Sequence, residues 1–114
     1  MYVDKSGREW SSEAVYKEYA CLLGALLDYQ LAFEDYSDAT GNNLFTAEPF
    51  VRLWEFRKNR DAMQERELMT EAREIFDGLK CLVETVGKEK FIFYDDGGVE
   101  YVWGNLKKGD KNKD

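Results

Sequence analysis

The sequence predicts a single α+β domain: a short N-terminal β-hairpin, two to three α-helices of which the first is long, and a C-terminal β-hairpin, with a small antiparallel sheet packed on the helices. Two patterns predict this class. Apolar residues recur at spacings of three and four over residues 13–38 and 68–86, which is typical of helices. Short alternating segments with glycine turns lie at both ends of the chain. The length of 114 residues suits one core. We expect that core within residues 1–106 and a disordered polar tail over residues 107–114.

The first hairpin is predicted over residues 2–10. A turn at residues 5–7 puts Gly7 where a left-handed conformation is needed, and this register pairs Tyr2 with Trp10. Ser11 or Ser12 can cap the long helix that follows, which should end near Asp38.

A second helix is expected after Thr46, a suitable cap, with Pro49 in its first turn. The polar residues 57–67 are either an exposed helical stretch or a bend, so the second and third helices are one rod or two. Thr70 could cap a separate third helix, and Gly87 is placed to end it.

The C-terminal hairpin is predicted over residues 90–103, with a turn at Asp96-Gly97. This register pairs Tyr94 with Val99, because a shift by one residue would set Asp95 opposite Glu100, which like-charge repulsion disfavours. It also places Tyr94, Tyr101 and Trp103 on one face.

The composition argues against most catalytic classes. The chain has no histidine, so it lacks the commonest general base and zinc ligand, and it contains no phosphate loop, dinucleotide fingerprint or nucleophile motif. We therefore expect no enzyme activity, no cofactor and no metal site. Cys21 and Cys81 are expected to be reduced and buried. Because no signal-peptide or membrane-spanning pattern is present either, we expect a cytoplasmic protein without a membrane partner.

Asp28 is a carboxylate inside the most apolar stretch, residues 21–36. On a helix with about 100° per residue, the residues nearest to it are small: Cys21, Gly24, Ala25 and Ala32. A stripe of small side chains lets another element approach closely, and a desolvated carboxylate needs a partner. The simpler interpretation is that Arg52 or Arg57 of this chain supplies it. The alternative is an open groove that receives a basic group from another molecule.

Acidic and aromatic side chains form the candidate binding surface under the second interpretation. The acidic face of the first helix is expected to comprise Asp28, Glu34, Asp35 and Asp38, with Tyr36 adding buried area. The hairpin aromatics Tyr94, Tyr101 and Trp103 are the second candidate set, because aromatic residues commonly anchor interfaces. They are also ordinary core residues.

A locally basic segment supports a different function. Around Trp54, the candidate basic face comprises Arg52, Arg57, Lys58 and Arg60. Arginines beside aromatic rings can bind single-stranded nucleic acid, although a polar helix face with ion pairs explains them equally simply.

The function predicted from the sequence is non-catalytic protein binding. A formal charge of −7 makes direct nucleic-acid binding unfavourable and suits a partner with a basic surface, such as a nucleic-acid-binding protein. Small acidic domains of this kind suit inhibitors, immunity proteins and phage or mobile-element counter-defence proteins of the anti-CRISPR-like kind, by analogy of class. The alternative is a nucleic-acid-associated regulator that uses the basic second helix. A homodimer is the other assembly that we consider.

Overall fold

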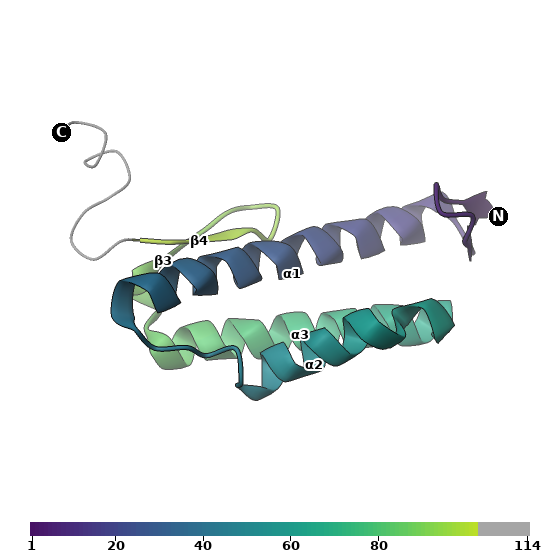
Figure 1. Cartoon of the computed structure of the whole chain (residues 1–114). Coiled ribbons are helices and arrows are strands. Elements are labelled where there is room, and N and C mark those ends of the chain that lie inside the picture. The colour runs from purple at the N-terminus through teal and green to yellow at the C-terminus, as the bar shows by residue number, and fades with distance from the viewer. Residues whose placement is uncertain (103–114) are drawn as a thin grey trace.

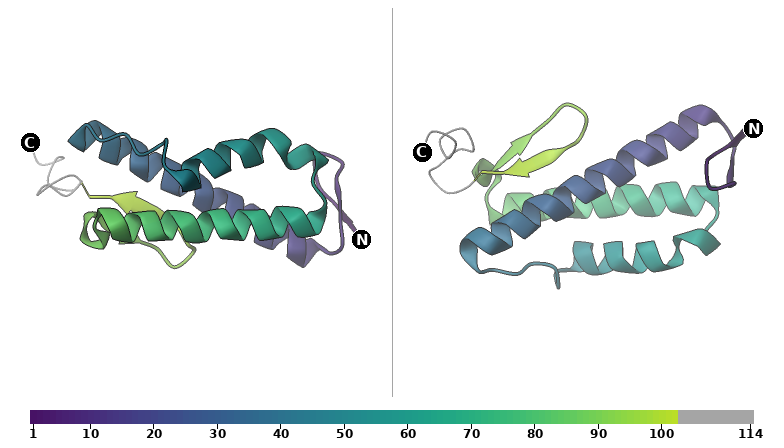
Figure 2. Two further views of the ribbon diagram at one scale, coloured as in Figure 1. Left: turned by 90° about the horizontal axis from the view of Figure 1, so that it is seen from below. Right: turned by 45° about the horizontal axis from the view of Figure 1, so that its top comes forward.

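The computed structural model describes residues 1–102 and shows an α+β protein with three α-helices and two small antiparallel sheets. In chain order the elements are β1 (Tyr2–Val3), β2 (Glu9–Trp10), α1 (Glu13–Thr40), α2 (Glu48–Asn59), the 3-10 turn η1 (Arg60–Ala62), α3 (Glu65–Val86), the 3-10 turn η2 (Lys88–Lys90), β3 (Phe91–Phe93) and β4 (Val99–Tyr101). The helices α2 and α3 lie side by side, and α1 packs across them (Figures 1 and 2).

The N-terminal hairpin has the predicted register, with Tyr2 opposite Trp10 and Gly7 at a φ of 91°. Ser12 caps α1 by accepting a hydrogen bond from the backbone N–H of Val15. The helix runs two residues beyond the predicted end, and Gly41 in a left-handed conformation terminates it.

The second and third helices are separate, and the polar segment between them forms the bend. Thr46 does not cap α2: the capping position is Ala47, which has no side-chain oxygen to accept the hydrogen bond. Thr70 does not cap α3, because the helix begins earlier: Gln64, six residues before Thr70, forms a reciprocal capping box with Glu67. Gly87 ends α3 as predicted.

Aromatic rings dominate the core between the helices. The ring of Phe33 on α1 lies 5.3 Å from that of Phe50 on α2 and 5.3 Å from that of Phe91 on β3. Phe91 also contacts Tyr101, so the C-terminal hairpin is fixed to the helices by the same cluster. Within residues 1–102, no helix is both long and apolar enough to cross a membrane.

The C-terminal hairpin forms, but its predicted register is wrong by one residue. Phe93 lies opposite Val99, and Phe91 lies opposite Tyr101. The turn has three residues rather than two, with Gly97 at a φ of 92° and the backbone N–H of Tyr94 donating to Gly98. The observed register is shifted in the opposite sense from the one that would set Asp95 opposite Glu100, so the like-charge argument did not bear on it. Asp95 lies in the turn, and Glu100 lies opposite Ile92.

The two hairpins do not join into one sheet. β1–β2 lies beside the N-terminal end of α1, and β3–β4 lies along its C-terminal half (Figure 1). Each end of α1 is therefore covered by its own hairpin, and each end carries a separate concave surface.

Candidate functional site

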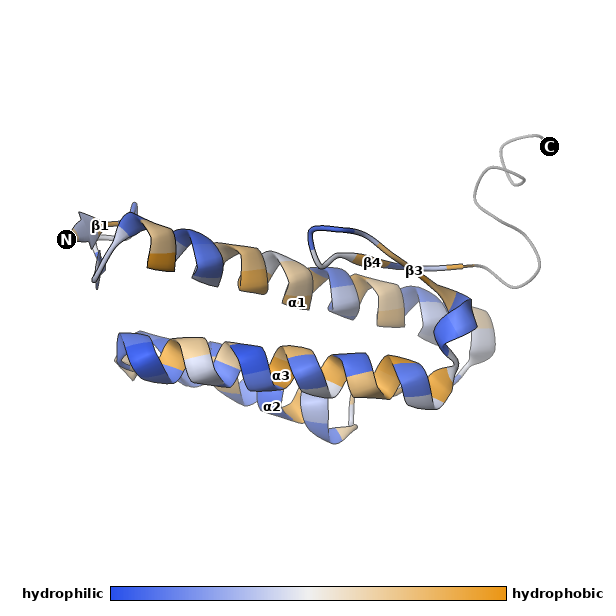
Figure 3. Cartoon of the chain, turned by 180° about the vertical axis from the view of Figure 1, so that it is seen from behind, coloured by the Kyte–Doolittle hydropathy of each residue, from blue (hydrophilic) through white to orange (hydrophobic). Residues whose placement is uncertain are grey.

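The protein's own C-terminal hairpin covers the part of the small-residue stripe of α1 that contains Ala25 and Ala32, whereas Cys21 and Gly24 are exposed. β4 packs against α1, and the loop joining β3 to β4 is hydrophilic and runs beside the helix (Figure 3). Ala25 and Ala32 are buried there. A Cβ atom at Gly97 would lie only 3.8 Å from the Cβ of Ala25. The stripe thus admits a close approach, as predicted, and the occupant is the hairpin backbone.

Asp28 lies at the edge of this contact and is half-buried. The internal arginine partners that we expected are engaged elsewhere: Arg52 donates to Glu71 and Glu74, and Arg57 donates to Gln30. Over residues 1–102, no ion pair joins the Asp28 carboxylate to a basic side chain. The hairpin backbone comes so close that a Cβ atom on Gly98 would lie 2.6 Å from Asp28 Oδ2.

A groove of about 470 Å³ remains between α1 and the hairpin, and we call it the acidic groove. Its lining comprises Asp28, Leu31, Ala32, Glu34 and Asp35 from α1 and Tyr94, Val99 and Glu100 from the hairpin. Every charged side chain among these residues is a carboxylate. Asp28 also lines a neighbouring recess of about 220 Å³ together with Asp96. The negative surface therefore continues along α1 on both sides of Asp28.

The structure brings together three of the four predicted acids of the first helix. Asp28, Glu34 and Asp35 line the acidic groove, whereas Asp38 is exposed one turn further on and outside it. Glu100 was missed as a groove residue. Its position follows from its pairing with Ile92, which only the correct register reveals.

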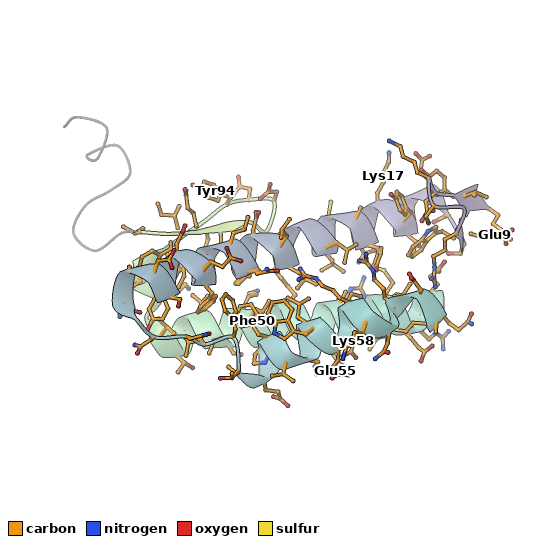
Figure 4. The ribbon with its side chains drawn as sticks, viewed as in Figure 1. Glu9, Lys17, Phe50, Glu55, Lys58 and Tyr94 are labelled. Carbon is orange, nitrogen blue, oxygen red and sulfur yellow. The ribbon has the colours of Figure 1, made fainter. Side chains whose placement is uncertain are left out.

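The predicted aromatic residues divide between core and surface. Tyr36 is 6% exposed and packs against Phe33 and Tyr101, so its ring belongs to the core rather than to a binding surface. Tyr101 is buried as well. Tyr94 is exposed, and its hydroxyl donates to Glu100 at 2.7 Å at the edge of the acidic groove (Figure 4). Trp103 lies outside the described residues.

Two leucines lie beside the carboxylates of α1. Leu27 and Leu31 are 47% and 48% exposed. Their spacing of four residues puts them on one stripe of α1 next to the carboxylates. The acidic groove thus has an apolar margin.

The four residues of the predicted basic face have different surroundings. Arg52 is neutralised by Glu71 and Glu74, and these hydrogen bonds raise its pKa. Arg57 stacks over Trp54 with 5.3 Å between guanidinium carbon and ring centroid. Lys58 is exposed on α2, on the opposite side of the molecule from Tyr94 (Figure 4). Arg60 lies in the turn η1, beside the N-terminal hairpin.

Neither cysteine is buried: Cys21 and Cys81 are free thiols at exposed positions, which corrects the expectation that both belong to the core. Within residues 1–102, no group of three or more carboxylate or thiol side chains has a geometry that could hold a metal ion. No family model, curated protein or solved structure matches this chain.

Proposed function

We propose that this protein is a non-catalytic binding module whose acidic groove receives basic side chains of a partner protein. One observation carries the proposal: the charged lining of the groove is wholly acidic and comes from two elements far apart in the sequence. Ion pairs inside the protein satisfy other acids, such as Glu71 and Glu18, but none reaches Asp28 over residues 1–102. The groove therefore offers carboxylates that an arginine or lysine from outside can pair with.

The margin of the groove supplies the apolar part of such an interface. Leu27, Leu31 and Tyr94 are each close to half exposed. Interfaces combine apolar anchors with a polar rim, and the buried anchors carry most of the binding free energy. A partner segment with alternating basic and apolar side chains matches this arrangement.

The net charge of the protein favours a partner with a positively charged surface. The net charge of −7 attracts a positively charged surface over several ångströms and raises the association rate. Basic protein surfaces of that kind commonly serve to bind nucleic acid. Occupation of such a surface would block it, and this is the action expected of an inhibitor, including one of the anti-CRISPR-like kind.

Direct nucleic-acid binding through α2 is the less favoured candidate. The stack of Arg57 on Trp54 supports it, since such a pair can hold an unstacked base. The pairing of Arg52 with two glutamates removes one of the four cations on which that function relied.

Affinity capture from cells of the protein's source tests the proposal. The groove variant carries Asp28→Asn, Glu34→Gln and Asp35→Asn. We expect the unmodified protein to retain a partner with a basic surface, and we expect the groove variant to lose it. Retention should weaken as salt is raised, because the contact is ionic.

A charge-matched control separates the groove from net charge. Glu55→Gln, Asp77→Asn and Glu84→Gln remove three exposed acids outside the groove. Glu55 lies on the side of the molecule opposite Tyr94 (Figure 4). The control should keep the partner. Equal recovery by the groove variant and the unmodified protein would refute the proposal.

A further inference from the structure

A second concave surface lies at the other end of α1, between the N-terminal hairpin and the turn that joins α2 to α3. Its volume is about 320 Å³, and residues from β2, α1, η1, α3 and the β1–β2 turn line it. We propose that this cavity binds a small phosphate monoester that carries an aromatic ring. The proposal is independent of the acidic groove, with which the cavity shares no lining residue.

Two arginines line the cavity, and neither forms a direct ion pair among the described residues. The guanidinium of Arg8 donates to the carbonyl of Met63 and lies over the Trp10 ring at 5.4 Å. Arg60 lies close enough to the hydroxyl of Tyr19 to oppose the rise that burial causes in the pKa of that phenol. Over residues 1–102, neither arginine is within ion-pair distance of a carboxylate. Both therefore contact uncharged groups, and Glu65, whose pKa is lowered by hydrogen bonds from Ser11 and more weakly by the charge of Arg8, balances only part of the Arg8 charge.

The positive character is local to this end of the molecule. Lys5, Arg8 and Arg60 line the cavity against two acids, Asp4 and Asp61. The Asp4 carboxylate accepts hydrogen bonds from Ser6 and from the Trp10 ring nitrogen at 2.8 Å; these lower its pKa, so it keeps its negative charge and the lining holds three cations against two anions. The excess of one cation in this lining favours an anion here over the acidic groove, whose charged lining is all carboxylate.

A phosphate monoester suits these donors better than a carboxylate does. It carries close to two negative charges at neutral pH and presents three terminal oxygens. Guanidinium groups bind such oxygens through paired N–H donors, and these charge-assisted hydrogen bonds are among the strongest in proteins. Two arginines and one lysine can therefore share one phosphate group.

The remaining wall of the cavity is apolar. Tyr16 and Leu23 on α1 are half-buried, and both line it. A flat ring attached to the phosphate can pack on this wall. Ligand pockets in proteins commonly measure about 300–1,000 Å³, so a cavity of about 320 Å³ takes one ring and one phosphate rather than a dinucleotide.

The test uses the full chain labelled with nitrogen-15 and titrated with phenyl phosphate and the four common nucleoside monophosphates. We expect saturable amide shifts at residues 5–8 and at Arg60 and Asp61, with no shifts at residues 91–101. Inorganic phosphate and the matching phosphate-free compounds should each bind at least about tenfold more weakly than the complete ligand, because each lacks one half of the recognition. Raised salt should weaken binding.

Arg60→Gln is the decisive variant, and Arg66→Gln on the exposed side of α3 is its charge-matched control. We expect Arg60→Gln to weaken binding at least about tenfold and Arg66→Gln to leave it unchanged. Absence of saturable shifts with every probe, equal binding of the phosphate-free compounds, or equal effects of the two variants would overturn the proposal. If Arg60→Gln fails to fold, the comparison of ligands on the unmodified protein still decides it.

Discussion

At Gly98 the backbone of the hairpin lies close to the Asp28 side chain of α1. An added Cβ atom would lie 2.6 Å from Asp28 Oδ2 and 3.0 Å from Asp96 Oδ1. We expect Gly98→Ala to lower the free energy of unfolding by about 1–2 kcal/mol, because the new methyl group forces the carboxylates to move. The cost should be smaller in an Asp28→Ala background. Urea denaturation of the four proteins in this cycle measures the coupling.

Gly24 provides the control for this prediction. It lies in the interior of α1, and a Cβ atom there would meet nothing within 4 Å. Gly24→Ala should therefore raise the free energy of unfolding by up to about 1 kcal/mol, the usual gain in helix propensity. If Gly98→Ala costs the same with and without Asp28, the contact between that carboxylate and the hairpin is not what sets the cost.

At the scale of the element, the N-terminal hairpin depends on the charge of one carboxylate. Hydrogen bonds from Ser6 and then Trp10 lower the pKa of Asp4 from 3.8 to about 2. A pKa lowered by folding means that the charged form stabilises the folded state. This stabilisation is fully present above about pH 4 and is lost as the pH falls toward 2. Asp4→Asn should remove that part of the pH dependence.

Thermal unfolding followed from pH 5 to pH 2 measures this effect. The melting temperature of the unmodified protein should fall more steeply over this range than that of Asp4→Asn. Asp38→Asn, which changes an exposed acid outside the hairpin, should keep the slope of the unmodified protein. Parallel curves for Asp4→Asn and the unmodified protein would show that the turn does not depend on this charge.

The hairpins also show what the sequence could predict at this scale. The first was predicted to its register because Lys5-Ser6-Gly7 offers one glycine and one suitable turn. The C-terminal hairpin has two glycines in succession, Gly97 and Gly98, so its sequence is compatible with a turn of two residues and with a turn of three. The structure has the three-residue turn. In the resulting register Phe91, Val99 and Tyr101 are buried in the core.

The site was predictable only in the part that one element supplies. The periodicity of α1 correctly grouped Asp28 and Asp35 beside a stripe of small residues. Glu100 could not be placed, because its position depends on how a distant hairpin packs on that stripe. The expected pairing of Asp28 with Arg52 failed for the same kind of reason: α3 presents Glu71 and Glu74 closer to that arginine.

At the scale of the whole molecule, α1 connects two regions of opposite charge. Its N-terminal half contributes Tyr16, Tyr19 and Leu23 to a cavity with excess cations, and its C-terminal half contributes three carboxylates to the acidic groove. A single long helix keeps these regions apart, so each can be changed without the other (Figure 1). The two proposals therefore predict binding effects that are separable by mutation.

Substitution of Phe91 tests whether the acidic groove depends on the packing of the C-terminal hairpin against the helices. Its ring lies 5.3 Å from that of Phe33 and 5.6 Å from that of Tyr101, and it is buried. Phe91→Ala should lower the free energy of unfolding by about 3–5 kcal/mol, because it leaves a cavity between hairpin and helices. Phe93→Ala on the same strand should cost much less, since that ring is 42% exposed.

The C-terminal hairpin forms one wall of the acidic groove. Phe91→Ala should detach this hairpin from α1, and it should therefore also abolish capture of a basic partner, although every acid of the groove remains in the chain. Hydrogen exchange reports the detachment directly, because the backbone N–H of Val102 donates across the hairpin to Lys90 at 2.8 Å. Phe91→Ala should lose protection at Val102 under conditions in which α1 stays protected. Loss of that protection with partner capture unchanged would mean that the acids of α1 bind without the hairpin, and the groove would reduce to one helix face.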